Sequence, residues 1–227
     1  MNNPLPTCPS RRRGFTLIEM LVVIAIITLL AGMVIPHAAI AAKKEKISRA
    51  QAEIKLLEVA IEQYKNKKGF YPPDNTNSAG QNQLFYELLG ATVNGATAAN
   101  LVFSNSFNAR DTIDGNTVAV VFSTGGIVNS SMDPTEVRNF IPNINPSLVK
   151  QVKVGASPNP FWVFVNPTEG PVTGMLPAVG GGQVNPYRYN SSSPTNNSNG
   201  YDLWVDILIG GNTNRISNWS ADPQIVH

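Results

Sequence analysis

The stretch "GFTLIEMLVVIAIITLLAGMVIP", residues 14–36, decides how this chain is built. Residues 15–35 carry one charge, the carboxylate of Glu19. At a rise of about 1.5 Å per residue, a helix over this run is roughly 30 Å long, which matches the hydrocarbon core of a bilayer. The sequence therefore predicts a membrane-spanning helix over residues 15–36. A cleaved secretory signal is the alternative, because small residues follow Pro36, but its apolar part would be shorter.

Basic residues flank the apolar run on both sides. Arg11, Arg12 and Arg13 directly precede it, whereas Lys43, Lys44 and Lys46 begin several residues beyond its end. Arginines next to a membrane helix favour the cytoplasmic side. We therefore expect a cytoplasmic N-terminus and an extracytoplasmic C-terminal region.

The charge of Glu19 inside this segment needs an explanation. An acidic side chain in a membrane helix costs about 2.5–3.5 kcal/mol on insertion scales and usually has a partner. Cleavage after Gly14 would create a cationic α-amine on Phe15, and the amine of a neighbouring copy could pair with Glu19 and set the register between packed helices. The alternative is a carboxylate that is protonated or reaches toward lipid headgroups near the cytoplasmic face.

The helix is expected to continue beyond the membrane to Lys68. Pro36 removes a backbone donor and Gly32 weakens the same region, so a kink or local melting is predicted there. Residues 37–68 then show apolar positions at helical spacing, and Gly69 ends the pattern. The apolar stripe consists of Ile47, Ala50, Ile54, Leu57, Ile61 and Tyr64. It is interpreted as the seam against a globular domain, with a coiled coil as the alternative.

Residues 69–227 are long enough for a globular domain. Short helices are expected at residues 81–90, with a glycine cap, and at residues 133–140, where Asp133, Pro134 and Glu136 suit a helix start. Strands are expected at residues 117–123 and 161–165, with a turn at 111–116. Residues 185–190 and 201–209 are predicted to form an antiparallel hairpin across the polar loop at residues 191–200. The expected fold class is thus α+β, with one long helix packed on a small antiparallel sheet.

Composition excludes several classes of function. The formal net charge is +2 with 17 basic and 15 acidic residues, and no basic stripe suggests a nucleic-acid partner. Cys8 is the one cysteine, so an intrachain disulfide is excluded, and so is thiol catalysis in the part of the chain after the expected cleavage point. Lipidation of Cys8 would require an apolar stretch before it, and none is present. His37 and His227 stand apart from any candidate catalytic group. We expect no enzyme.

The N-terminal segment resembles the class III signal and helix of type IV pilins and type II secretion pseudopilins, with G-F-T-L-I-E as its most specific part. The resemblance implies that a prepilin peptidase cleaves between Gly14 and Phe15 and N-methylates Phe15. Glu19 matches the glutamate at the fifth mature position, and Pro36 matches the helix-bending proline. Residues 1–14 would be the leader, and residues 15–36 would leave the lipid to form the core of a helical filament.

Further stretches are similar to the major, G-type pseudopilin of type II secretion. They are "AEIKLLEVAIEQYKNKKGFYPP" (52–73), "NPYRYN" (185–190), "YDLWVDILIGG" (201–211) and "ISNW" (216–219). The resemblance implies a pilin-like fold and a periplasmic filament. The implied partners are other copies of the chain, minor pseudopilins and an inner-membrane assembly platform. Residues 80–183 match nothing in that family and are interpreted as an insertion on the filament surface.

Calcium is the one cofactor that the resemblance raises, because that family binds it in an aspartate-rich C-terminal loop. Residues 210–219 contain no carboxylate, whereas Ca²⁺ prefers several carboxylate oxygens. Asp202, Asp206, Asn212 and Asn214 are weak candidate ligands. A hydrogen-bonded asparagine turn without metal is the favoured interpretation.

Two functions stay open from the sequence. The first is a subunit of the type II secretion filament, anchored in the inner membrane before assembly. The second is a structural subunit of a surface type IV pilus that serves adhesion, motility or DNA uptake. An enzyme tethered by one membrane helix would need a catalytic cluster that the sequence lacks.

Overall fold

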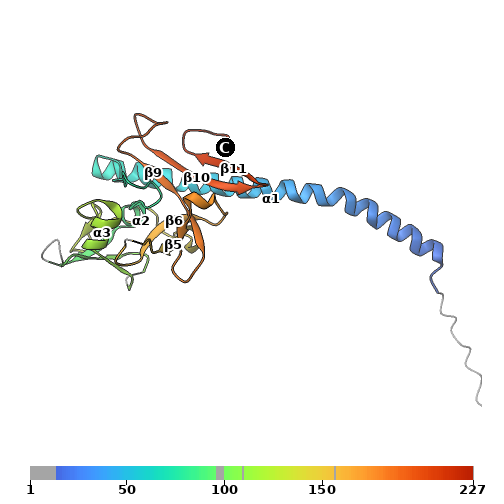
Figure 1. Cartoon of the computed structure of the whole chain (residues 1–227), viewed down its shortest axis with the longest axis horizontal. Coiled ribbons are helices and arrows are strands. Elements are labelled where there is room, and N and C mark those ends of the chain that lie inside the picture. Colours follow the sequence, from blue (N-terminus) through green and yellow to red (C-terminus); the bar gives the residue numbers. More distant parts are fainter. Residues whose placement is uncertain (1–13, 96–99, 109, 156, 227) are drawn as a thin grey trace, which may run out of the picture. The chain divides into compact units, whose positions relative to one another are not determined.

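The computed structural model describes residues 14–95, 100–108, 110–155 and 157–226, with the side chains of residues 33–39 left aside. Arg11, Arg12, Arg13, Cys8 and His227 lie outside the described residues. The chain divides between Lys44 and Glu45 into two units. Figure 1 shows the long N-terminal helix and, further along the chain, the strands and short helices of the second unit.

Helix α1, Leu17–Lys68, runs through both units. In the first unit its large apolar side chains are exposed, from Phe15 and Leu17 to Leu30. Among the described residues, no helix is both long and apolar enough to cross a membrane, and the segment expected over residues 15–36 stays a prediction. The helix is continuous at Gly32 and Pro36, so the alternative of local melting is wrong, whereas the kink stays a prediction.

In the second unit, the apolar stripe of α1 is the seam to the globular part, as expected. Ile54, Leu57, Ile61 and Tyr64 are buried in one core cluster with residues of strand β10, Asp202–Ile209. Leu56 and Val59, on another face of the same helix, are about half exposed. Only one face of this part of α1 therefore packs within the chain.

The C-terminal sheet has the strand order β12-β11-β10-β9. Its strands are β9 (Arg188–Asn190), β10 (Asp202–Ile209), β11 (Asn212–Ser217) and β12 (Gln224–Val226). Strands β9 and β10 pair antiparallel, which confirms the predicted hairpin. The expected strand over residues 185–190 is nevertheless split, because Asn185 and Pro186 pair with β6 in the neighbouring sheet.

That neighbouring sheet has the order β5-β6-β8-β7. It contains β5 (Val149–Val152), β6 (Phe161–Asn166), β7 (Leu176–Pro177) and β8 (Gln183–Pro186). The short 3₁₀ helix η2 (Pro146–Leu148) precedes β5, and η3 (Val172–Gly174) lies between β6 and β7. The strand expected at residues 161–165 is confirmed. An isolated antiparallel bridge also pairs Val152, at the end of β5, with Ala178, directly after β7.

The third sheet has the order β3-β2-β1-β4. It contains β1 (Ala91–Asn94), β2 (Val102–Asn105), β3 (Thr112–Asp114) and β4 (Ser130–Ser131). Helix α2 (Leu84–Leu89) precedes β1 in sequence, and helix α3 (Gly115–Phe122) lies between β3 and β4. Helix α2 confirms the helix expected at residues 81–90, and Gly90 follows it at φ 79°. A Cβ at Gly90 would clash with Val137 and lie 2.9 Å from the Arg138 carbonyl oxygen, so a larger residue would be strained there.

Three predictions in this region are wrong. The strand expected at residues 117–123 is helical up to Phe122, within α3, and Ser123 ends the helix. The Asp114 carboxylate caps this helix by accepting a 2.6 Å hydrogen bond from the Thr117 amide. Residues 111–116 accordingly contain strand β3 rather than a turn before a strand.

The third error is the helix expected at residues 133–140, which form turns and irregular backbone. The capping box is broken because Glu136 accepts a hydrogen bond from the Ser131 hydroxyl (2.6 Å) and the Asp133 amide donates to the Ser131 oxygen (3.1 Å). Residue 131 thus takes both partners that a capping box would join.

Residues 80–183 are part of the same core as α1. Their buried side chains include Phe85, Phe122, Phe161 and Phe164, which belong to one cluster with Leu57. The region interpreted as an insertion therefore supplies the whole of the third sheet, strands β5, β6 and β7 of its neighbour, and much of the core.

Two carboxylates connect α1 to this core, that of Glu87, which is fully buried, and that of Glu53, which is partly buried. Glu87 on α2 accepts hydrogen bonds from the Tyr64 hydroxyl (2.9 Å) and from the amides of Val128 and Asn129 (2.8 and 2.9 Å). Burial raises the pKa of Glu87 above its ordinary value, although these hydrogen bonds act in the opposite direction. The group holds the end of α1, helix α2 and residues 128–129 together.

Glu53 makes the second connection. Its carboxylate accepts hydrogen bonds from the Tyr187 hydroxyl (2.6 Å) and the Asn166 amide (2.8 Å), and it pairs with Arg49 at 2.9 Å. It therefore joins α1 to the sheet that contains β6.

Two adjacent leucines of α1 provide a test of the seam. Leu57→Ala removes a fully buried side chain (0% exposed) and should lower the free energy of unfolding by about 2–5 kcal/mol. Leu56→Ala, at a side chain that is 43% exposed, should change it by less than about 0.5 kcal/mol. Thermal or urea unfolding of the full chain in detergent measures both, and equal effects would contradict the assignment of the seam.

Candidate functional site

The start of helix α1 is built around Thr16 and Glu19. The Glu19 carboxylate accepts hydrogen bonds from the Thr16 amide and the Thr16 hydroxyl, both at 2.8 Å. The Thr16 hydroxyl oxygen in turn accepts a 3.3 Å hydrogen bond from the Glu19 amide. This reciprocal arrangement is a capping box, and it satisfies amide groups that the first turn of a helix leaves without partners.

The capping box was missed from the sequence, although its signature, threonine followed three residues later by glutamate, is present in "TLIE". Capping of the helix by the Glu19 side chain is thus a second reason for a carboxylate at this position, beside pairing with an amine. The bonded oxygen is Oε2 in both cases, and the side chain is directed toward the helix start. Phe15 directly precedes Thr16, so the Glu19 carboxylate lies near the backbone position where cleavage after Gly14 would leave an amine.

Gly14 and Phe15 themselves are exposed. Within the described part of the chain, nothing lies within 4 Å of a Cβ built on Gly14. None of the described residues therefore blocks the access of another protein to the expected scissile bond.

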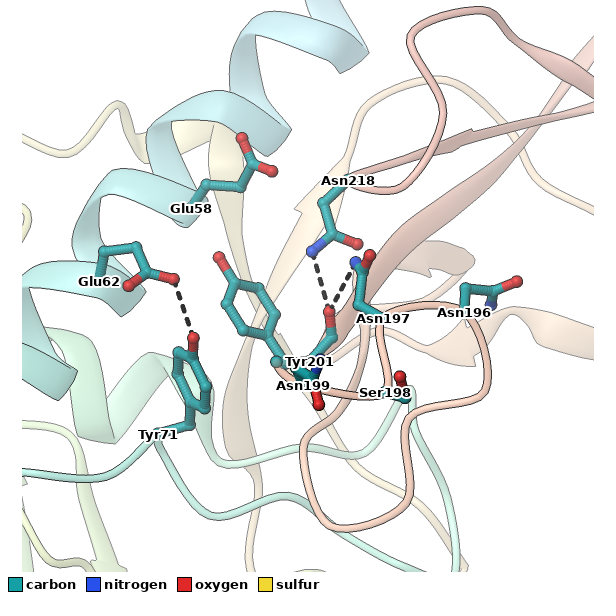
Figure 2. A pocket seen from close by; sticks show the side chains of 10 residues that line it. Glu58, Glu62, Tyr71, Asn196, Asn197, Ser198, Asn199, Tyr201 and Asn218 are labelled. Carbon is teal, nitrogen blue, oxygen red and sulfur yellow. Dashed lines mark hydrogen bonds between the residues drawn. The ribbon is translucent and has the colours of Figure 1, made fainter.

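A polar notch lies between helix α1 and the 191–200 loop (Figure 2). Glu58 and Glu62 project from α1, and Tyr71, Tyr201 and residues 196–200 face them. Tyr71 donates a 3.3 Å hydrogen bond to Glu62, and Lys55 pairs with Glu58 at 2.8 Å. Burial, followed by the charges of Glu58 and Glu62, raises the pKa of Tyr201.

The weak calcium candidates are not brought together as a metal site. Asp202 accepts hydrogen bonds from the amides of Thr195 (2.8 Å), Asn196 (2.9 Å) and Asn197 (2.8 Å), and from the Asn196 side chain (3.0 Å). Burial raises its pKa, but these hydrogen bonds outweigh burial and the net direction is downward. The carboxylate is ionised and directed at N–H donors.

Asp206 is likewise committed to a partner. Its two oxygens accept hydrogen bonds from Arg215 Nε (2.8 Å) and Nη2 (3.0 Å), and Arg188 Nη1 lies 3.9 Å away. Arg215 and Asp206 are directly opposite each other on β11 and β10. A guanidinium occupies the side of the carboxylate that a cation would need.

Asn212 and Asn214 sit on β11 directly after a tight turn. Gly210 and Gly211, with φ 60° and 84°, join β10 to β11, and Ile209 pairs with Asn212. Two positive-φ residues between paired strands are typical of a type I′ turn, which leaves no loop to wrap around an ion. Among the described residues, no group of three or more histidine, cysteine or acidic side chains could hold a metal. The residues present therefore do not fit a calcium site at this hairpin.

Comparisons with known proteins agree with the N-terminal features. Residues 9–35 match the family described as the prokaryotic N-terminal methylation motif. Type II secretion system core protein G of Escherichia coli (strain K12) is 42% identical over 67 residues, which are 29% of this chain and 45% of that protein. The protein of the same name from Aeromonas hydrophila is 37% identical over 89 residues, which are 39% of this chain and 54% of that protein. No solved structure matches this chain.

The similarity is partial in both directions. The chain spans about half the length of the curated relatives it matches, and the match leaves most of its own residues uncovered. Over the matched residues, the methylation motif and the matches to core protein G confirm the resemblance to the superfamily of type IV pilins and type II secretion pseudopilins. The matches to core protein G also confirm the resemblance to the G-type pseudopilin.

Proposed function

We propose that this chain is the precursor of the major subunit of a type II secretion filament. In this proposal it is held in the inner membrane by residues 15–36, with the N-terminus cytoplasmic and the globular part periplasmic. A prepilin peptidase cleaves it after Gly14 and N-methylates Phe15. Its partners are other copies of the chain, minor subunits and an inner-membrane assembly platform.

The observation that carries the proposal is the start of α1. An exposed apolar helix begins at a capping box whose carboxylate is directed toward the expected cleavage point, and this stretch lies inside the matched methylation motif. Exposed apolar surface of this extent needs either lipid or protein around it. The filament provides packing against neighbouring copies, and lipid provides it before assembly.

Cleavage is tested with Gly14→Leu. A branched side chain next to the scissile bond should prevent processing, so the variant should accumulate as a precursor that immunoblotting separates from the mature form. Thr28→Ala is the control, since the Thr28 hydroxyl donates within its own helix to Ile24 and Ala25 carbonyls (both 2.9 Å), and this variant should be processed normally. A Gly14→Leu chain still cut between residues 14 and 15 would refute the peptidase assignment.

The role of the Glu19 charge is tested with two substitutions. Glu19→Ala should leave processing intact and abolish or disorder filaments, because the partner of the Phe15 amine is lost. Glu19→Gln keeps an acceptor for the Thr16 capping box but removes the charge. Filaments seen by electron microscopy in Glu19→Gln but not in Glu19→Ala would show that the cap alone is needed and would defeat the charge pairing.

A deletion strain decides between the two kinds of filament. Loss of secreted proteins with unchanged surface fibres is the expected result for a secretion subunit, and restoration by the wild-type gene is the control. Loss of surface fibres with secretion intact would instead assign the chain to a type IV pilus.

A further inference from the structure

The 191–200 loop has no helix or strand and is nevertheless held at both ends by carboxylates. Asp74 accepts hydrogen bonds from the amides of Ser191 (3.1 Å) and Ser192 (3.2 Å) and from the Ser192 hydroxyl (2.8 Å). Asp202 does the same for residues 195–197. Successive backbone amides that converge on one anion form a concave donor site.

Asp202 is the more deeply placed of these two anchors. It is 3% exposed, and its oxygens accept from three consecutive backbone amides and one side-chain amide. The positive ends of these donors point at the carboxylate, so a cation approaching the same oxygens would be repelled unless the loop opened. Hydrogen bonds to an ionised acceptor are also roughly twice as strong as neutral ones.

The anchored loop in turn positions Tyr201 against helix α1. The side chains of Asn197 and Asn218 each donate a 3.0 Å hydrogen bond to the Tyr201 carbonyl (Figure 2). The Tyr201 ring packs edge-on against the Tyr71 ring, with 4.9 Å between the ring centroids. The position of the loop therefore shapes the notch that faces Glu58 and Glu62. A change in the position of the loop would therefore also move Tyr201 at the surface of α1.

We infer that the Asp202 carboxylate, bound by the amides of residues 195–197, orders the C-terminal sheet and its loop in place of a bound cation, so that this chain folds independently of calcium. The Asp206–Arg215 pair and the two-glycine turn complete this metal-free arrangement on β10 and β11. The inference concerns folding, and it holds whether the filament is a secretion filament or a pilus.

The test measures amide hydrogen exchange and thermal unfolding of the full chain in detergent, with 1 mM CaCl₂ or with EGTA at about 10 mM, an excess that lowers free metal by mass action. The wild-type amides of residues 195–197 should be protected equally in both conditions, and the melting temperature should not move. Protection or melting temperature that falls in EGTA and returns with calcium would overturn the inference without any variant.

Asp202→Asn provides the second arm. Asparagine keeps one neutral acceptor oxygen and puts an NH2 donor in place of the other, so the hydrogen bonds from residues 195–197 should weaken. Exchange of these amides should speed up by roughly tenfold or more, and calcium should not restore their protection. Asp222→Asn is the matched control, since Asp222 is exposed, and it should leave these amides unchanged. Unchanged exchange in a folded Asp202→Asn chain would overturn the role of Asp202.

Discussion

The apolar stripe of helix α1 is the constraint on which the rest of this structure depends. A helix with Ile54, Leu57, Ile61 and Tyr64 on one face cannot remain in water without a cover, because most helical stability in proteins comes from packing an amphipathic face. The inward residues of β10, together with α2 and β6, supply that cover in one continuous core. The short strands, few of which exceed six residues, gain stability from the helix in return, since isolated small sheets are marginal.

Carboxylates perform much of the joining between elements. Glu53 and Glu87 connect α1 and α2 to distant segments, Asp202 holds the 191–200 loop, and Asp206 pairs across two strands. Removing a carboxylate from water is costly unless it is paired, and each of these accepts at least two hydrogen bonds. Glu87, Asp202 and Asp206 are buried, and Glu53 is partly buried. In each case the carboxylate is engaged by hydrogen-bond donors of the chain itself, and for Glu53, Glu87 and Asp206 the two segments it joins are far apart in sequence or lie on different strands.

Patterns with long, regular spacing were the part of the fold that the sequence could predict. The 3-4 spacing from Ile47 to Tyr64 gave α1 and its buried face, and the alternation over residues 201–209 gave β10 and its hairpin with β9. The short apolar run at 117–123 could not be assigned to a helix or a strand from its periodicity alone. The cap at Asp114 favours the helix. The helix expected at 133–140 failed because Ser131, outside the motif, captured both partners of the capping box. At the candidate site, the sequence identified the acidic and amide side chains that could act as ligands. It could not predict that Asp202 accepts hydrogen bonds from residues 195–197, because this contact depends on the path of the 191–200 loop, which has no sequence signature.

The capping box changes how the charge at Glu19 is understood. Charge pairing and helix capping do not exclude each other, because the capping contacts use one carboxylate oxygen, Oε2. A side chain already held toward the helix start loses less conformational entropy when a partner arrives than a free glutamate would. In the proposed filament, Thr16 would therefore pre-orient the carboxylate for the amine of a neighbouring subunit. The cost of a charge in lipid is then reduced twice, first by the amide and hydroxyl of Thr16 within the chain, and afterwards by the cation of another copy.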